Sequence, residues 1–94
     1  MLISILFQLT SRFVTIAELH HHIHQKQFVR SRTTTKQAQS LLSAMLNFED
    51  TTDDVENRFL ANPEDLSFLL GLKIKLHNFI EQTHDEINRG RLIA

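Results

Sequence analysis

A long uninterrupted stretch near the end of the chain, residues 63–89, constrains the fold more than any other feature. Asn62 before it is a favoured helix N-cap residue, and Pro63 suits the first helical position because proline lacks the N–H that would go unpaired there. Gly90 beyond it is typical of the residue that follows a helix. At 1.5 Å per residue the stretch predicts a helix of roughly 40 Å.

The apolar pattern changes along this expected helix. Apolar residues surround its first half, which predicts a buried half, and then narrow to one side, which predicts a half that protrudes. Gly71 lies inside the helix and disfavours it by about 1 kcal/mol relative to alanine. We interpret this glycine as the mark of a close approach by another helix.

A stripe along the same helix has the alternating spacing of three and four residues that is typical of a coiled-coil seam. It consists of Leu66, Leu69, Lys73, Leu76, Ile80, Thr83 and Ile87. Its protruding part is the predicted surface for a partner helix or for a second copy of the chain. The residues expected to make this contact are Leu76, Phe79, Ile80, Thr83 and Ile87.

Two further helix starts are predicted by threonines that precede apolar periodicity. Thr15 with Glu18, and Thr34 with Gln37, match the capping box, in which the two side chains satisfy backbone N–H groups at the helix start. Each motif is followed by apolar residues at helical spacing. We therefore expect one helix to begin at Thr15 and another near Thr34.

The remaining segments complete a helical bundle. The helix from Thr34 is expected to end near residues 48–51, and Thr52 is expected to cap a short helix after it. Residues 3–9 form an apolar run that fits a helix or a strand, and a helix is favoured because no other segment offers a strand partner. The prediction is a single all-α domain over residues 1–94, a small four- to five-helix bundle with a long C-terminal helix.

Composition excludes several classes of protein. The chain is 41% apolar, as in ordinary globular proteins, and its lack of cysteine excludes disulfides, thiolate metal sites and cysteine nucleophiles. Its apolar runs fall short of the roughly 18 residues that cross a bilayer, and no basic segment precedes the apolar start as in a signal peptide. We therefore expect a cytoplasmic protein with no membrane contact.

The net charge of −1 conceals an uneven distribution. Residues 1–40 carry +4, residues 41–70 carry −6 and residues 71–94 carry +1. A nucleic-acid-binding protein usually has a clear basic excess, whereas this chain has only a basic patch.

That patch lies where the second predicted helix begins. Arg30, Arg32, Thr33 and Lys36 combine guanidinium, hydroxyl and ammonium groups with helix N-terminal amides, a combination that can hold phosphate. A segment of this kind between two helices could dock on a nucleic-acid backbone as helix-turn-helix proteins do. The connection is longer than the usual tight turn of that motif, and a solvated loop is the alternative interpretation.

The histidines form two groups with helical spacing. His20 and His24 share one face of the first helix, and His77, Glu81 and His84 share one face of the long helix. Imidazole and carboxylate groups spaced in this way can bind a transition metal inside a helical bundle. A solvated polar face is the alternative for both groups. A pH-sensing role is a further alternative for the first group, since neighbouring imidazoles repel each other when charged.

The chain has no motif for catalysis. It lacks the nucleophile-elbow, phosphate-loop and zinc-protease signatures, and it has neither Tyr nor Trp to stack on a base or sugar ring. We expect no enzymatic activity and no cofactor. The favoured function is a non-enzymatic protein–protein interaction module, such as an adaptor, chaperone or regulator, in which a homodimer is one form of the contact. The alternatives are a small nucleic-acid-binding regulator and, third, a metal-binding bundle.

Overall fold

The computed structural model of the chain describes the backbone of residues 2–25 and 32–88 and the side chains of residues 3–24 and 36–88. The described residues form three α-helices, α1 (Leu2–Gln25), α2 (Arg32–Glu56) and α3 (Pro63–Asn88), and one 3-10 helix, η2 (Asn57–Phe59). The prediction of an all-α fold is confirmed, but the predicted count of four to five helices is wrong. None of the described helices is both long enough and apolar enough to cross a bilayer.

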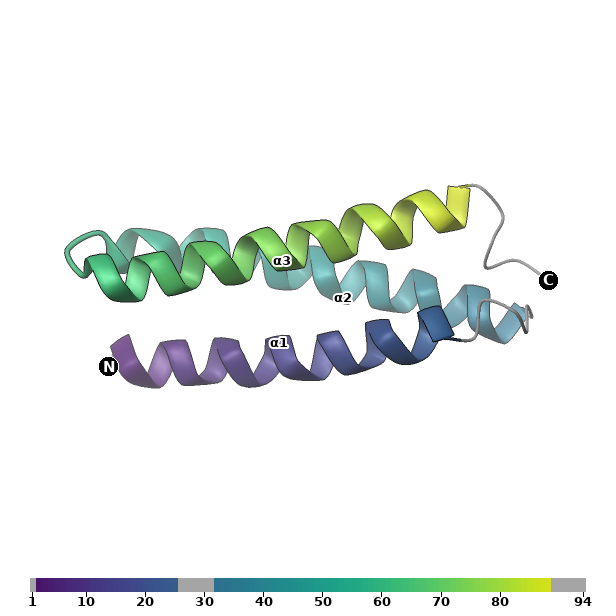
Figure 1. The fold of residues 1–94 in the computed structure, drawn as a ribbon, viewed down its shortest axis with the longest axis horizontal. Coiled ribbons are helices and arrows are strands. Elements are labelled where there is room, and N and C mark those ends of the chain that lie inside the picture. The colour runs from purple at the N-terminus through teal and green to yellow at the C-terminus, as the bar shows by residue number, and fades with distance from the viewer. Residues whose placement is uncertain (1, 26–31, 89–94) are drawn as a thin grey trace.

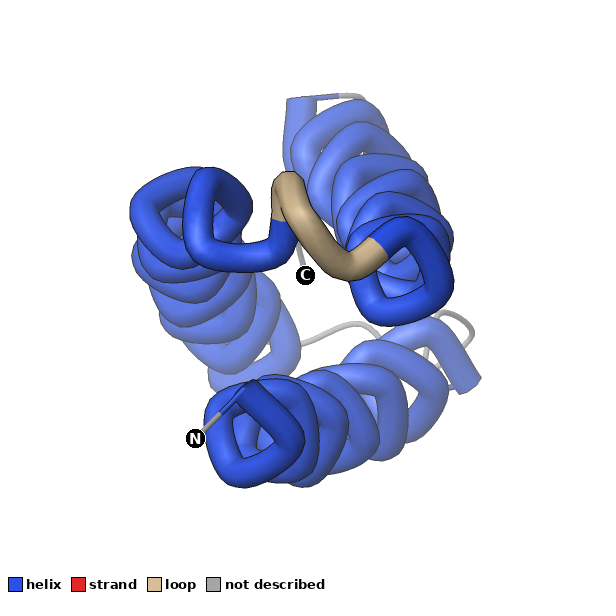
Figure 2. The backbone as a smooth tube through the Cα atoms, turned by 90° about the vertical axis from the view of Figure 1, so that its left-hand side faces the viewer, coloured by secondary structure: helices blue, strands red, loops and turns tan. Residues whose placement is uncertain are grey.

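The three helices lie side by side along the length of the molecule (Figure 1). α1 and α3 run in one direction and α2 runs in the other, and the view along the bundle shows the helices at the corners of a triangle (Figure 2). The molecule measures 48 × 19 × 16 Å. Every helix therefore has one face toward the other two over most of its length.

The core follows the same alternation of three and four residues in each helix, as in a coiled coil. In α1 the inward positions are Leu6, Leu9, Phe13, Ile16, His20 and Ile23; in α2 they are Ala38, Leu41, Met45, Phe48, Thr52 and Val55; in α3 they are Leu69, Leu72, Leu76, Phe79, Thr83 and Glu86, with Ile80 also buried beside Phe79. The inward positions together form the seam of the bundle. On α3 they differ from the predicted stripe, which included Lys73 and Ile87 and omitted Leu72 and Glu86.

Two predicted helix starts lie inside longer helices. Thr15 is in the middle of α1, where its Oγ1 donates to the Ser11 carbonyl at 3.2 Å, and Thr52 is in α2, where its Oγ1 donates to the Glu49 carbonyl at 2.7 Å. A threonine hydroxyl can be satisfied by the preceding turn of its own helix, so a capping motif does not by itself mark a start. Residues 3–9 are helical as favoured, and they are continuous with the rest of α1.

The other predicted starts agree with the structure. α2 begins at Arg32, two residues before the predicted Thr34, and α3 begins at Pro63. The Leu66 N–H donates to the Asn62 carbonyl at 2.9 Å, which is the first bond of α3. The predicted end of this helix at Gly90 lies outside the described residues.

The two halves of α3 are not buried as predicted. In the first half Phe68 and Ile74 are exposed, while in the second half Ile80 and Thr83 are buried. The second half is covered because α1 and α2 continue alongside it. Gly71 is not a close-contact site either, since a Cβ built on it has no heavy atom of a neighbouring helix within 4 Å.

Candidate functional site

A buried polar cluster joins α1 to α3 near the C-terminal end of both helices. It consists of His20 and His24 on α1 and Thr83 and Glu86 on α3. His24 Nδ1 lies 2.6 Å from Glu86 Oε2, and His24 Nε2 lies 3.2 Å from Thr83 Oγ1. Three of the four residues, His20, Thr83 and Glu86, are buried in what is otherwise an apolar seam.

The contact between His24 and Glu86 is an ion pair by distance without the alignment of a hydrogen bond. Neither His24 Nδ1 nor Glu86 Oε2 has an aligned hydrogen-bond partner in the described part of the chain, although the two atoms lie 2.6 Å apart. A buried carboxylate is costly unless a partner compensates its charge. Among the described residues, His24 is the partner that lies within reach of this carboxylate.

His20 is held by ring contacts instead of hydrogen bonds. Its ring stacks on Phe79 with centroids 4.2 Å apart and lies 4.1 Å from the ring of His24. Its Nε2 is buried with no hydrogen-bond partner among the described residues. Burial, together with the nearby His24 and His21, lowers the pKa of His20 to about 4 from its ordinary value of 6.5. The ring is thus neutral at neutral pH.

A second polar group lies on the outer side of the α2–α3 contact. Lys73 Nζ lies 2.6 Å from Asp53 Oδ1 and also pairs with Glu56. Burial of Lys73 opposes its charge, but the bonds and charges of Asp53 and Glu56 outweigh it and raise the pKa of the ammonium. On the same side, His77 lies 3.4 Å from both Glu49 and Glu81. This group ties α2 to α3 by charge.

An apolar groove runs between α1 and α2 on the surface and has a volume of about 410 Å³. Leu19, Ile23, Leu41 and Ala44 supply its apolar walls, and Leu19 is 48% exposed. The remaining lining residues are His22, Lys36, Gln37 and Ser40. The groove therefore combines an uncovered leucine with a basic rim and has no carboxylate among its lining residues.

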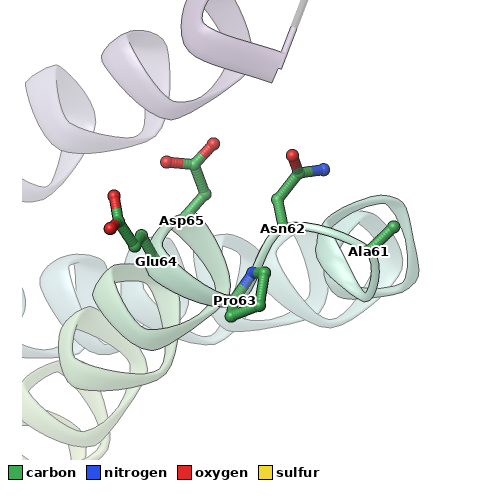
Figure 3. Close-up of a pocket in the computed structure, with 5 residues that line it drawn as sticks. All are labelled: Ala61, Asn62, Pro63, Glu64 and Asp65. Atoms are coloured by element: carbon green, nitrogen blue, oxygen red, sulfur yellow. The ribbon is translucent and has the colours of Figure 1, made fainter.

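A second hollow lies where η2 leads into α3 (Figure 3). It is lined by Ala61, Asn62, Pro63, Glu64 and Asp65, and the two carboxylates project from the first turn of α3. Acidic residues at this place complement the positive end of the helix dipole. The hollow is explained by the start of the helix and requires no ligand.

The predicted partner stripe on α3 is covered by the chain itself. Leu76, Ile80 and Thr83 are buried, and Phe79 and Ile87 are half-buried against the core. Phe79 stacks on Phe13 of α1, with ring centroids 5.7 Å apart. The sequence-based assignment of these residues to a free surface is therefore corrected: α1 and α2 already occupy the seam.

The predicted metal ligands are divided between two places. His20 and His24 lie in the buried polar cluster, His77 and Glu81 lie on the outer side of α3, and His84 pairs with Asn88 at 3.1 Å. Over the described ranges, no group of three or more His, Asp or Glu side chains is arranged to hold a metal ion. The rings of His20 and His24 lie 4.1 Å apart and His77 lies 3.4 Å from Glu81, as the helical spacing predicts, but the groups of the two helices do not converge on one site.

The predicted phosphate-binding residues lie at or beyond the start of α2. Arg30 is outside the described residues, and Arg32 and Thr33 belong to the first turn of α2. The side chain of Lys36 is exposed and lines the α1–α2 groove.

The sequence-based predictions missed two features of the candidate sites. Glu86 was not selected, although its spacing from Thr83 and Phe79 continues the three-four alternation of α3. The α1–α2 groove was also missed. Its walls come from two helices, and the sequence does not show how these helices are rotated relative to each other. Comparisons with protein-family models, with curated proteins and with solved structures found no match.

Proposed function

We propose that the chain is a non-enzymatic protein-interaction module that binds an acidic amphipathic helix of a partner protein in the α1–α2 groove. The observation that carries this proposal is the position of Leu19, which is half exposed within a groove walled by Ile23 and Leu41. An uncovered apolar side chain in a concave apolar surface is what a helix docking by its own apolar face requires.

The charge of the groove argues for an acidic partner. Lys36 supplies an ammonium group to the lining of the groove, and the imidazole of His22 lies in the same lining. Acidic residues flanking the apolar face of a partner helix would complement this rim and speed the encounter. The carboxylates of α2, such as Asp53 and Glu56, lie on its other side toward α3 and would not repel such a partner.

Burial of the polar cluster argues against a catalytic role for its groups. His20 and Glu86 are each 7% exposed, so a substrate could reach neither side chain without opening the bundle. A general acid or base must come within hydrogen-bond distance of the atom that it serves.

The test uses two designed amphipathic peptides with the same leucine face, one flanked by glutamates and the other by lysines. Isotope-labelled protein is titrated with each peptide and followed by amide chemical shifts. We expect the acidic peptide to shift amides along the groove and Leu19→Asp to weaken binding by roughly tenfold or more. Ile74→Asp is the matched control, since Ile74 is exposed on α3 away from the groove and its substitution should leave binding unchanged.

Reversal of the rim charge sharpens the test. Lys36→Glu should shift the preference from the acidic toward the basic peptide. Equal binding of both peptides by the parent chain, or shifts confined to other surfaces, would overturn the proposal. Tight binding of a DNA duplex that weakens steeply with salt would instead favour the nucleic-acid alternative.

A further inference from the structure

We propose that the buried polar cluster is an acid-sensitive latch on the end of α3. At neutral pH, His20 stacked on Phe79 and His24 in contact with Thr83 and Glu86 hold this end against α1, and they release it when the pH falls. The latch is separate from the α1–α2 groove and goes beyond the proposed interaction function.

The environment of His20 disfavours a charge on its ring. Its ring is packed between Phe79 and His24, and its buried Nε2 has no acceptor among the described residues. Protonation would place a positive charge where the described structure offers nothing to accept the added proton. A buried charge without a partner is strongly unfavourable, so protonation favours a conformation in which the ring reaches water.

The ionisable groups near His20 do not offset a charge on its ring. On α1 these are His21 and His24, both of which oppose a charge on His20. On α3 the facing carboxylate is Glu86, and it already lies against His24 Nδ1. One carboxylate cannot compensate two imidazolium groups whose rings lie 4.1 Å apart.

α2 does not supply the charge compensation that a protonated His20 would need. The described core residues of α2 toward this end are apolar, Ala38 and Leu41, and its Lys36 is cationic and lines the groove beside His22. Residues 36–45 of α2 include no carboxylate.

The release is expected to stay local. The core at the opposite end of the bundle, where α2 leads into α3, contains fully buried apolar side chains such as Phe59 and Leu69. Ionisation of histidine does not alter these contacts. The α1–α3 contact should therefore open at the cluster before the whole bundle unfolds.

The test is amide hydrogen exchange, corrected for the intrinsic effect of pH, on the full chain at neutral pH and in mild acid. We expect protection of residues 20–24 and 83–87 to fall roughly tenfold or more between neutral pH and about pH 4.5, because the unfolded form of His20 takes up a proton at higher pH than the folded form. Amides around Phe59 and Leu69 should lose much less protection.

A variant of His20 tests whether its ring nitrogen causes the loss of protection in acid. His20→Phe keeps an aromatic ring against Phe79 but cannot take up a proton, so its local acid response should be lost. His22→Gln removes an exposed histidine from the same helix turn and should keep the full response. A full acid response in His20→Phe, or undiminished protection of the parent cluster at about pH 4.5, would overturn the latch.

A second measurement covers the case in which His20→Phe does not fold. The ring protons of His20 in the parent chain are followed by nuclear magnetic resonance through the same pH range. The latch requires that His20 protonate together with the loss of amide protection. Protonation of His20 near its ordinary pKa with the cluster amides still protected would disprove it.

Discussion

His24 on α1 and Glu86 on α3 meet inside the bundle, with Nδ1 and Oε2 2.6 Å apart. Glu86 is the one buried carboxylate among the side chains that the structure describes. This pair places polar groups in a seam whose other inward positions are mostly apolar. It defines the contact between the ends of the two parallel helices and gives the first prediction.

Removal of the carboxylate should destabilise the bundle. Glu86→Ala leaves a cavity and deprives half-buried His24 of its partner, so we expect a loss of roughly 2–4 kcal/mol in the free energy of unfolding. Urea unfolding followed by circular dichroism measures this, since the chain has no tryptophan for fluorescence. Glu81→Ala, at an exposed position of the same helix, should cost less than about 1 kcal/mol. Equal effects of the two substitutions would contradict the assignment.

The stability of the chain should fall in mild acid because of His20. Its folded pKa of about 4 lies below the ordinary value of 6.5, so the unfolded chain binds more protons between these two values. The contribution is therefore fully present above about pH 6.5 and is lost as the pH falls toward about 4, with an upper bound of about 3 kcal/mol. Urea unfolding at a series of pH values should show a steeper decline for the parent chain than for His20→Phe. Parallel curves for the two chains would count against it.

A charge at Ile80 should unfold the chain instead of blocking a partner. Ile80 is 7% exposed within the seam, so Ile80→Asp would bury an unpaired carboxylate and should abolish the cooperative fold. Ile74→Asp places the same group at a position that is 63% exposed and should change stability by less than about 1 kcal/mol. Thermal melting by circular dichroism distinguishes the two. A folded Ile80→Asp variant would show that the seam is not closed as described.

Substitution of Gly71 should stabilise the chain. A Cβ at this position meets no neighbouring heavy atom within 4 Å, and the backbone is helical. Gly71→Ala should therefore raise the free energy of unfolding by about 0.5–1 kcal/mol, because alanine loses less backbone freedom on folding. A lower melting temperature of this variant would indicate a contact that the structure does not contain.

The ammonium of Lys73 should contribute to the α2–α3 contact. Lys73→Met leaves Asp53 and Glu56 without their common partner, and we expect a loss of about 1 kcal/mol that shrinks at high salt. Lys75→Met is the matched control, because Lys75 is exposed on the same helix. Similar losses for both variants at low and high salt would contradict the bridge.

Local signals in the sequence were sufficient for the helical class and for one boundary. Asn62 and Pro63 act on the backbone within a single turn, so the start of α3 could be read without knowledge of any other helix. Thr15 and Thr52 misled for the opposite reason: the same hydroxyl that caps a helix also bonds to its own preceding turn when the helix continues. Neighbouring residues in the sequence do not show whether such a threonine caps a helix start or lies inside a helix that continues.

The candidate site depended on the rotation of each helix about its axis. The sequence placed His20 and His24 on one face and Thr83 on the seam, but it also placed Lys73 there and passed over Glu86. The predicted stripe and the observed inward positions of α3 differ here by one residue. Leu72 is buried in the core, whereas Lys73, the next residue, pairs with Asp53 of α2.

The sequence by itself determined an all-α chain with a long final helix, because near-absence of glycine and proline and apolar spacing act locally. Only the tertiary structure decided that α1 and α2 each run unbroken, that the α3 stripe is filled from within, and that His24 meets Glu86. These features follow from the packing of three helices around one seam, because the inward face of each helix is buried by residues of the other two helices, which lie far away in the chain. A one-dimensional pattern shows that a helix has an apolar face, whereas the neighbouring helices decide what covers it.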